Sequence, residues 1–452
     1  MPLAGLTARV ACGRLVAGLQ EKAGQDGAVE RFHRRSAARY SELLGRSRGV
    51  LMKAAQILSM ADNRDWGGGG FGPYLDALGQ VQAEVPAMDP LLVRRLLDAE
   101  VDSDRFAEFD EQPVASASIG QVHRAVLRDG RAVAVKVQYP GVARAIRDDL
   151  ANAELLVTFL QWVRAATAVR ADIRAVAREA AARIGEEIDY RHEAQTITTF
   201  AELYRGHPFI RIPQVVPEVS GDRVLTMTYL DGMDWCQARN ADQELRNAWA
   251  EGITRFLHSN GRLSNLMHGD PHPANYRFFP DGTVGCLDFG CVQVFTEHER
   301  WVWFSLLRAA MEGRKSDLRD LAEQAGFLDS DPTLAEEELY QWAAELLCDV
   351  IAEPQPVTYT PQVQARVLRN MFSLKDSNHV MARVSFPRVI AFTGRQQLGL
   401  VNICTLLGAT LPVRAIFDDT DGVAEPVTAL GAQHHAWVAE RGLSLPRRPD
   451  HP

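Results

Sequence analysis

The stretch His268-Gly269-Asp270-Pro271-His272-Pro273-Ala274-Asn275 decides the fold of this chain, together with Asp288-Phe289-Gly290, which begins thirteen residues after Asn275. Two acids and one amide at this spacing can present carboxylate and amide oxygens to the same small volume. Magnesium prefers oxygen ligands and takes only one or two of them from the protein when a substrate supplies others. Asn275 and Asp288 are therefore the predicted metal ligands, and Asp270 is the predicted catalytic carboxylate.

A lysine upstream extends this pattern. Lys136 ends the sequence Val-Ala-Val-Lys in an apolar strand, and a buried ammonium without a partner costs several kcal/mol or more. Glu193 is the best helical candidate for that partner, because kinase-like folds pair such a lysine with a glutamate and with nucleotide phosphates. The alternative is an edge-strand lysine that reaches solvent. Together with the acids and amide downstream, Lys136 predicts binding of Mg-ATP in a kinase-like fold.

The loop expected to cover the phosphates departs from that of ordinary protein kinases. Those enzymes use glycine there, because glycine lets backbone amides approach phosphate closely. Here residues 113–120 read PVASASIG, so the predicted ATP-binding residues are Ala115, Ser116, Ala117 and Ser118, joined by Tyr229 at the end of a later strand. We expect a less mobile lid and an altered preference between nucleotides. The alternative is a plain turn at the start of a strand.

Composition excludes some classes of function. The chain has 452 residues with 49 basic and 58 acidic side chains, a net charge of −9, which argues against general nucleic-acid binding. Its six cysteines form no CxxC pair, so a reducing compartment is expected. The apolar run at 389–411 is interrupted by Arg395 and predicts a buried helix rather than a transmembrane span. The first twenty residues lack the apolar core of a secretory signal.

The order of elements predicts an α+β, bilobal, protein-kinase-like fold. Residues 1–105 are expected to form an N-terminal helical extension, whose glycine-rich run at 66–72 is a flexible connection. Residues 106–232 are expected to form a small β-rich N-lobe with a helical insert, including a hairpin that turns at Asp129-Gly130. Residues 233–424 are expected to form a helical C-lobe with one short hairpin at 276–287. Residues 425–452 are expected to be a loosely ordered tail.

At this level of detail the sequence resembles the UbiB family of atypical kinase-like proteins, whose members carry an AarF domain. The resemblance covers roughly residues 30–410. Four motifs carry it: Lys53-Ala54-Ala55-Gln56, the alanine-rich loop running into Gly120-Gln121-Val122-His123, Glu187-Ile188-Asp189, and the Asp270 loop with its Asp-Phe-Gly. Ala55 and Ala274 stand where the family has glycine. The resemblance implies a place in coenzyme Q, isoprenoid-quinone or related lipid metabolism.

The resemblance also implies roles for residues outside the basic kinase pattern. Lys53 and Gln56 would fold over the active site, with Glu187 and Asp189 nearby, and Lys53 would join Lys136 and Asp270 as a catalytic residue. The extension would then block the surface where protein kinases dock peptides. No Ala-Pro-Glu follows the Asp-Phe-Gly at a suitable distance, so the usual peptide platform is expected to be missing. These features favour ATP hydrolysis, or phosphorylation of something small, over protein phosphorylation.

Three functions stay open on the sequence. The first is an atypical kinase-like ATPase that uses ATP and Mg²⁺ and acts in, or regulates, quinone or related lipid metabolism. The second is a small-molecule phosphotransferase of the aminoglycoside or choline kinase type, which shares a similar His-Gly-Asp loop. The third is a nucleotide-gated scaffold with little catalysis. Expected partners are Mg-ATP, a membrane lipid or isoprenoid-quinone precursor, and proteins of a biosynthetic complex. The expected location is cytoplasmic, with peripheral contact at the inner face of a membrane.

Overall fold

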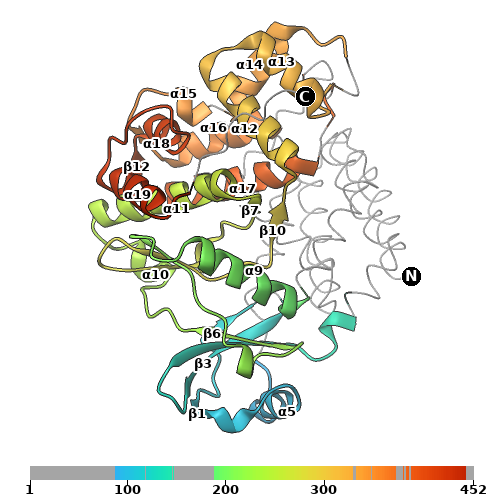
Figure 1. Cartoon of the computed structure of the whole chain (residues 1–452), viewed down its shortest axis with the longest axis vertical. Helices are drawn as coiled ribbons and strands as arrows, with labels where there is room; N and C mark the ends of the chain where they lie inside the picture. Colours follow the sequence, from blue (N-terminus) through green and yellow to red (C-terminus); the bar gives the residue numbers. More distant parts are fainter. Residues whose placement is uncertain are drawn as a thin grey trace, which may run out of the picture. The chain divides into compact units, whose positions relative to one another are not determined.

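The computed structural model describes residues 87–117, 119–144, 146, 188–328, 332–347, 349–372, 380, 383–385 and 388–443. The expected N-terminal helical extension therefore lies almost wholly outside the described residues. Contacts divide the chain into a first unit, Met1–Ala194 with Val215–Tyr229, and a second unit, Gln195–Gln214 with Leu230–Pro452. Among the described residues, the first unit contains the five-stranded sheet and the second contains most of the helices, which confirms the predicted α+β class (Figure 1).

The first unit is built on one antiparallel sheet in the order β1-β3-β4-β6, with β2 paired to β3. The predicted hairpin is present, and its register pairs Val122 with Lys136 across β3 and β4. Strand β4 is buried along nearly its whole length, as expected of a central strand rich in valine and alanine. The bounds are β1 Phe106–Phe109, β2 Ala115–Ser116, β3 Gly120–Leu127, β4 Ala132–Gln138 and β6 Val224–Thr228, with α5 Pro90–Glu100, η1 Ser103–Arg105 and η2 Pro217–Val219.

Helix α11 (Gln243–Leu263) is the centre of the second unit. Every residue from Trp249 to Gly261 is buried, which is typical of a helix surrounded by others. It packs against α17 (Arg388–Leu407) and α18 (Val413–Thr420) (Figure 1). Among the described residues of this unit, no helix is long and apolar enough to cross a membrane.

The remaining described elements of the second unit are a mixture of short strands and helices. They are β5 Ile210–Arg211, α10 Trp235–Ala238, β7 Leu266–His268, η3 Pro273–Asn275, β8 Tyr276–Phe278, β9 Val284–Cys286, β10 Val292–Val294, α12 Glu297–Glu312, α13 Lys315–Gln324, α14 Glu336–Leu347, α15 Asp349–Ala352, β11 Val357–Thr358, α16 Pro361–Phe372, β12 Thr410–Leu411 and α19 Ala429–Glu440. Helix α9, Tyr190–Leu203, begins in the first unit and continues into the second.

Three local expectations were wrong. The strand expected at 209–216 shortens to β5, and residues 195–214 belong to the second unit because Phe200 packs on Phe256 and Phe289. The paired strands β7–β10 and β11–β12 were not expected in the helical half. The tail is not loosely ordered throughout, since its residues 429–440 form α19. Trp437 of that helix is buried, and its indole Nε1 donates to the carbonyl of Arg205 at 3.1 Å.

Candidate active site

In the first unit, Lys136 and Glu193 form the expected ion pair. The lysine Nζ lies 2.7 Å from Oε1 and 3.0 Å from Oε2 of the glutamate. Only 7% of Lys136 and 2% of Glu193 are exposed, so both charges have left water. Strand β4 supplies the lysine, and the first turn of α9 supplies the glutamate. The ammonium also lies 5.5 Å from the centre of the Tyr190 ring, which adds a cation–π contact.

The alanine-rich loop forms a small hairpin next to this pair. Ala115 and Ser116 form β2 and pair with Val122 and Gln121 of β3, and the amide of Ala117 donates to the carbonyl of Gly120 at 2.9 Å. The loop is therefore tied to the sheet by backbone bonds, and its role as a less mobile lid stays a prediction. Ser118 lies outside the described residues.

Gly120 is required by close packing. A Cβ on this residue would lie 2.3 Å from the carbonyl oxygen of Val137 and 2.9 Å from the Tyr190 hydroxyl, so any side chain would push the loop away from β4. Tyr229 follows β6, its amide donates to the carbonyl of Ala132 at 2.9 Å, and its ring lies 5.4 Å from the Arg124 guanidinium. Its role at a nucleotide remains a prediction.

The family's Gln-Val-His segment has a structural role. His123 Nδ1 lies 2.7 Å from the carbonyl oxygen of Asp110, which can only accept, so this nitrogen carries the proton. Nε2 then accepts from the Gln121 side-chain amide at 2.8 Å, and Gln121 Oε1 accepts from the amide of Met88 at 2.9 Å. Burial lowers the pKa of His123, which keeps the ring neutral in this tautomer. The chain of hydrogen bonds fixes the start of β3.

Asp189 caps a helix in the structure. Its Oδ1 accepts from the amides of Arg191 and His192, both at 3.0 Å, and so satisfies two donors at the start of α9, the helix that carries Glu193. The other residues of the occluding set, Lys53, Gln56 and Glu187, lie outside the described residues. Their expected place over the site stays a prediction.

In the second unit, His268 organises the candidate catalytic loop (residues 268–275) from within the core. Its Nε2 donates to the carbonyl of Asp288 at 2.7 Å, which ties β7 to the Asp-Phe-Gly segment. Burial lowers the pKa of His268, so the ring is neutral at physiological pH. Phe289 is fully buried and meets the His268 ring edge-to-face, with centroids 5.5 Å apart. These contacts bring the two halves of the sequence motif together.

Asp270 is held by a residue that sequence reasoning missed. Arg395 of α17 places Nη2 2.6 Å from Asp270 Oδ1, and both side chains are mostly buried, with 17% and 14% exposed. On the other side, Asn275 Nδ2 donates to the Asp270 carbonyl at 3.1 Å and lies 3.4 Å from its Oδ2. The candidate catalytic carboxylate is thus fixed from two directions.

A sequence signal for Arg395 existed. It begins the polar break Arg-Gln-Gln in an otherwise apolar run, and that break had served only to argue against a membrane span. The residue after it, Gln396, donates to the carbonyl of His268 at 2.8 Å. Helix α17 therefore contacts the candidate catalytic loop with two successive side chains.

The oxygen atoms of Asn275 and Asp288 have the chemistry that Mg²⁺ prefers in its ligands. Asn275 uses Nδ2 on Asp270, which leaves the amide Oδ1 as its metal-binding atom. Asp288 Oδ1 accepts from the amide of Gly290 at 3.0 Å, and this turn fixes the orientation of the carboxylate. The described residues contain no cluster of three or more His, Cys, Asp or Glu side chains that could hold a metal alone. Such a sparse set suits Mg²⁺ brought in with phosphates.

Glycine and alanine positions in the loop agree with its geometry. A Cβ on Gly269 would lie 2.1 Å from the Phe392 ring of α17, so only glycine fits. Ala274 lies in the 3₁₀-helix η3, where φ is negative, so the alanine at this family glycine position is unstrained. Ala55 lies outside the described residues.

Comparisons with known proteins identify relatives of this chain. The family described as the ABC1 atypical kinase-like domain matches residues 80–322. The chain is 27% identical to the atypical kinase COQ8B, mitochondrial, of Rattus norvegicus over 91% of this chain and 74% of that protein. It is 29% identical to the atypical kinase COQ8, mitochondrial, of Saccharomyces cerevisiae, over 64% of this chain and 57% of that protein.

A solved structure also matches this chain. Rv3197 of Mycobacterium tuberculosis, described in complex with erythromycin, has a TM-score of 0.61 and 29% identity, and the match covers 91% of this chain and 99% of that one. The chain spans only 50% to 74% of the length of several curated relatives, including that of Caenorhabditis elegans. Because the family match covers more than half of its 452 residues, the chain belongs to the ABC1 family of atypical kinase-like proteins, also known as the UbiB or AarF-domain family.

Proposed function

We propose that this protein binds Mg-ATP and hydrolyses it slowly, in or alongside isoprenoid-quinone or related lipid metabolism at a membrane surface. The observation that carries the proposal is the buried Lys136–Glu193 pair. Two desolvated charges cost more free energy than their attraction returns unless further groups use them, so such a pair is poor evidence of a purely stabilising role. A nucleotide phosphate is the group that kinase-like folds bring to this lysine.

The second unit supplies the other groups that the reaction needs. Asn275 Oδ1 and the Asp288 carboxylate would hold Mg²⁺, which would neutralise charge on the phosphate oxygens. Asp270 would orient a water whose oxygen attacks the γ-phosphorus, and the bond from that phosphorus to the oxygen of the ADP leaving group breaks. The proton of the water passes to Asp270 and then to solvent. Arg395 holds Asp270 in place and brings a positive charge beside it.

Hydrolysis is favoured over transfer to a protein hydroxyl. Asp270 already accepts from Arg395, which leaves less of its carboxylate for a bulky acceptor. After the Asp-Phe-Gly, the chain enters β10 and then α12 at Glu297, so no long activation segment intervenes. Both features suit a small nucleophile such as water.

The test is ATP turnover with and without anionic liposomes in wild type, Asp288→Asn and a matched control, Asp281→Asn. Asp281 lies in the exposed β8–β9 turn, where it pairs with Arg211 at 2.7 Å. We expect Mg²⁺-dependent phosphate release that rises with liposomes, falls by at least about tenfold in Asp288→Asn and stays at the wild-type rate in Asp281→Asn. Absence of any Mg-nucleotide binding by the wild-type protein would overturn the proposal. Phosphate found on a soluble alcohol in a metabolite screen would favour the small-molecule phosphotransferase instead.

A further inference from the structure

The second unit contains a cavity that no part of the proposed ATP chemistry uses. Its volume is about 90 Å³, and it lies among residues of α11, α12, α15, α17 and α18. Four aromatic side chains contribute to its wall: Trp303, Phe304, Tyr359 and Phe417. Aliphatic side chains, including Leu307 and Leu400, form much of the remainder. The lining is therefore suited to an apolar molecule.

The cavity is larger than the voids that ordinary packing leaves in a protein interior. Protein interiors are packed as tightly as organic crystals, and voids larger than a water molecule are few. A single water needs roughly 10–15 Å³ of such volume, while an apolar cavity of roughly 150 Å³ in another protein takes up benzene. The cavity of about 90 Å³ lies between these values, nearer to the ligand than to the water. An apolar lining also gives water few partners there.

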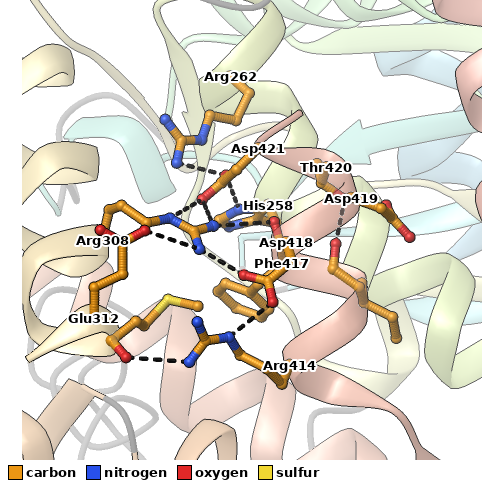
Figure 2. Close-up of polar contacts among 12 residues, drawn as sticks. His258, Arg262, Arg308, Glu312, Arg414, Phe417, Asp418, Asp419, Thr420 and Asp421 are labelled. Carbon is orange, nitrogen blue, oxygen red and sulfur yellow. Dashed lines mark hydrogen bonds and ion pairs between the residues drawn. The ribbon is translucent and has the colours of Figure 1, made fainter. Parts of the chain in front are cut away.

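One wall of the cavity is held rigid by a buried cluster of charges. Figure 2 shows Arg262, Arg308 and His258 converging on Asp421, just after α18. His258 Nε2 lies 2.8 Å from Asp421 Oδ1, and its ring is 4.1 Å from that of Phe417. Both His258 and Phe417 line the cavity. Hydrogen bonds and ion pairs of this cluster thus hold two lining residues, because His258 contacts Asp421 and Arg308 Nη2 donates to the Phe417 carbonyl at 3.4 Å.

Another lining residue links the cavity to the candidate catalytic loop. Gln396 of α17 lines the cavity, and its Nε2 donates to the carbonyls of Leu257 at 3.3 Å and His268 at 2.8 Å. The preceding residue, Arg395, holds Asp270. Any occupant that shifts α17 by a few tenths of an ångström would alter both contacts with the loop.

We propose that this cavity binds a ring-sized apolar small molecule and that the occupant changes ATP turnover through α17. The binding does not depend on the proposed function, whereas the effect on turnover rests on it. The Gln396 side chain gives its donors to backbone carbonyls, so Oε1 is the atom with which it would accept a hydrogen bond from a ligand carrying one polar group.

Binding is tested with fluorobenzene as the probe, followed by ¹⁹F NMR on the full chain. Leu400→Phe on α17 and Leu307→Phe on α12 each add volume to the cavity from a different helix. Leu406→Phe is the matched control, because it makes the same change on α17 at an exposed position that does not line the cavity. We expect wild type and Leu406→Phe to broaden and shift the ¹⁹F signal, unlabelled benzene to reverse this, and both filled variants to lose it.

Several outcomes would overturn the proposal. A wild-type protein that leaves the ¹⁹F signal unchanged up to the solubility limit refutes it without reference to any variant. Binding that persists in both filled variants places the ligand elsewhere. Circular dichroism melting checks that each variant is folded, and a bound ligand at about ten times its Kd should raise the wild-type Tm by roughly 3 °C.

The effect on turnover is measured on the same proteins. We expect saturating fluorobenzene to change the ATP hydrolysis rate of wild type and Leu406→Phe by about twofold or more, and to leave that of Leu400→Phe unchanged. Binding without any change in turnover would overturn the coupling through α17 while the ligand site stands. A protein that binds fluorobenzene but no Mg-nucleotide would refute the proposed function and leave the cavity site intact.

Discussion

Replacement of Lys136 by methionine should separate the stability of the site from its chemistry. Methionine keeps much of the length of lysine and removes the charge, so Glu193 would remain in the interior without the ammonium at 2.7 Å. With only 2% of Glu193 exposed, water cannot replace that ammonium. Loss of one partner from a buried ion pair typically costs about 3–5 kcal/mol. We therefore expect Lys136→Met to lower the free energy of unfolding by about that amount.

A double-mutant cycle isolates the interaction between the two side chains. Its second change is Glu193→Gln, made alone and together with Lys136→Met. The double variant buries no net charge, and its unfolding free energy should return to within about 1.5 kcal/mol of wild type, because well-packed neutral replacements of buried pairs are often tolerated. The coupling energy between the two positions should therefore be a large fraction of either single effect.

Urea denaturation followed by circular dichroism gives the four unfolding free energies, and calorimetry with Mg-ADP gives the affinities. We expect the double variant to regain stability without regaining nucleotide affinity. Equal unfolding midpoints for wild type and Lys136→Met would refute the view that the pair is desolvated. Normal Mg-ADP affinity in the stable double variant would show that Lys136 does not contact phosphate. The surface change Arg128→Met, which likewise replaces a cationic side chain by methionine but at an exposed residue beside the β3–β4 turn, serves as the control.

Three further predictions concern the second unit. Arg395→Lys keeps the charge but loses the planar guanidinium fork. We therefore expect near-normal Mg-ATP affinity with kcat lowered by about tenfold or more in steady-state assays. An unchanged kcat would show that Arg395 does not position Asp270 for the reaction. Gly269→Ala should lower the unfolding free energy by about 1–3 kcal/mol in urea, because its Cβ would lie 2.1 Å from the Phe392 ring, and Phe392→Leu in the same chain should recover much of the loss. Burial lowers the pKa of His434 from 6.5 to about 3, so the folded ring stays neutral where the unfolded chain binds a proton. The contribution of the neutral His434 ring to the free energy of unfolding is complete above pH 6.5. It is lost as the pH falls toward 3, at about 1.4 kcal/mol per pH unit. His434→Gln should therefore flatten the fall in stability between pH 6.5 and 5, and an unchanged slope would contradict this reasoning.

Local patterns were enough to predict most of the first unit. Alternation of apolar residues around Asp129-Gly130 predicted the β3–β4 hairpin, since side chains of a strand alternate between its faces and this dipeptide favours a tight turn. The same register placed Lys136 in the central strand. The partner Glu193 was found because the burial of a charge demands an opposite charge, and kinase-like folds supply it from a glutamate on a helix.

The contacts that were missed join segments far apart in the sequence. Arg395 and Asp270 are separated by 125 positions, and no periodic pattern within either segment connects them. Helix α19 was missed because its sequence is weakly patterned and follows a turn-rich stretch. It is held by tertiary contacts, such as the hydrogen bond of 3.0 Å between His207 and His434. Pattern alone cannot report a helix whose stability comes from packing.

The position of Arg395 bears on the choice between hydrolysis and transfer. A carboxylate that takes a proton from an acceptor hydroxyl needs a lone pair directed at that hydroxyl, and Arg395 already uses one oxygen of Asp270 at 2.6 Å. Asn275 Nδ2 lies 3.4 Å from the other oxygen, so an incoming nucleophile must share it. Water can fit such a constrained base more readily than a substituted alcohol can. Arg395→Met should therefore raise transfer to small alcohols relative to hydrolysis, even as total turnover falls. An unchanged ratio of alcohol phosphorylation to phosphate release would place the control of this choice outside the Asp270–Arg395 pair.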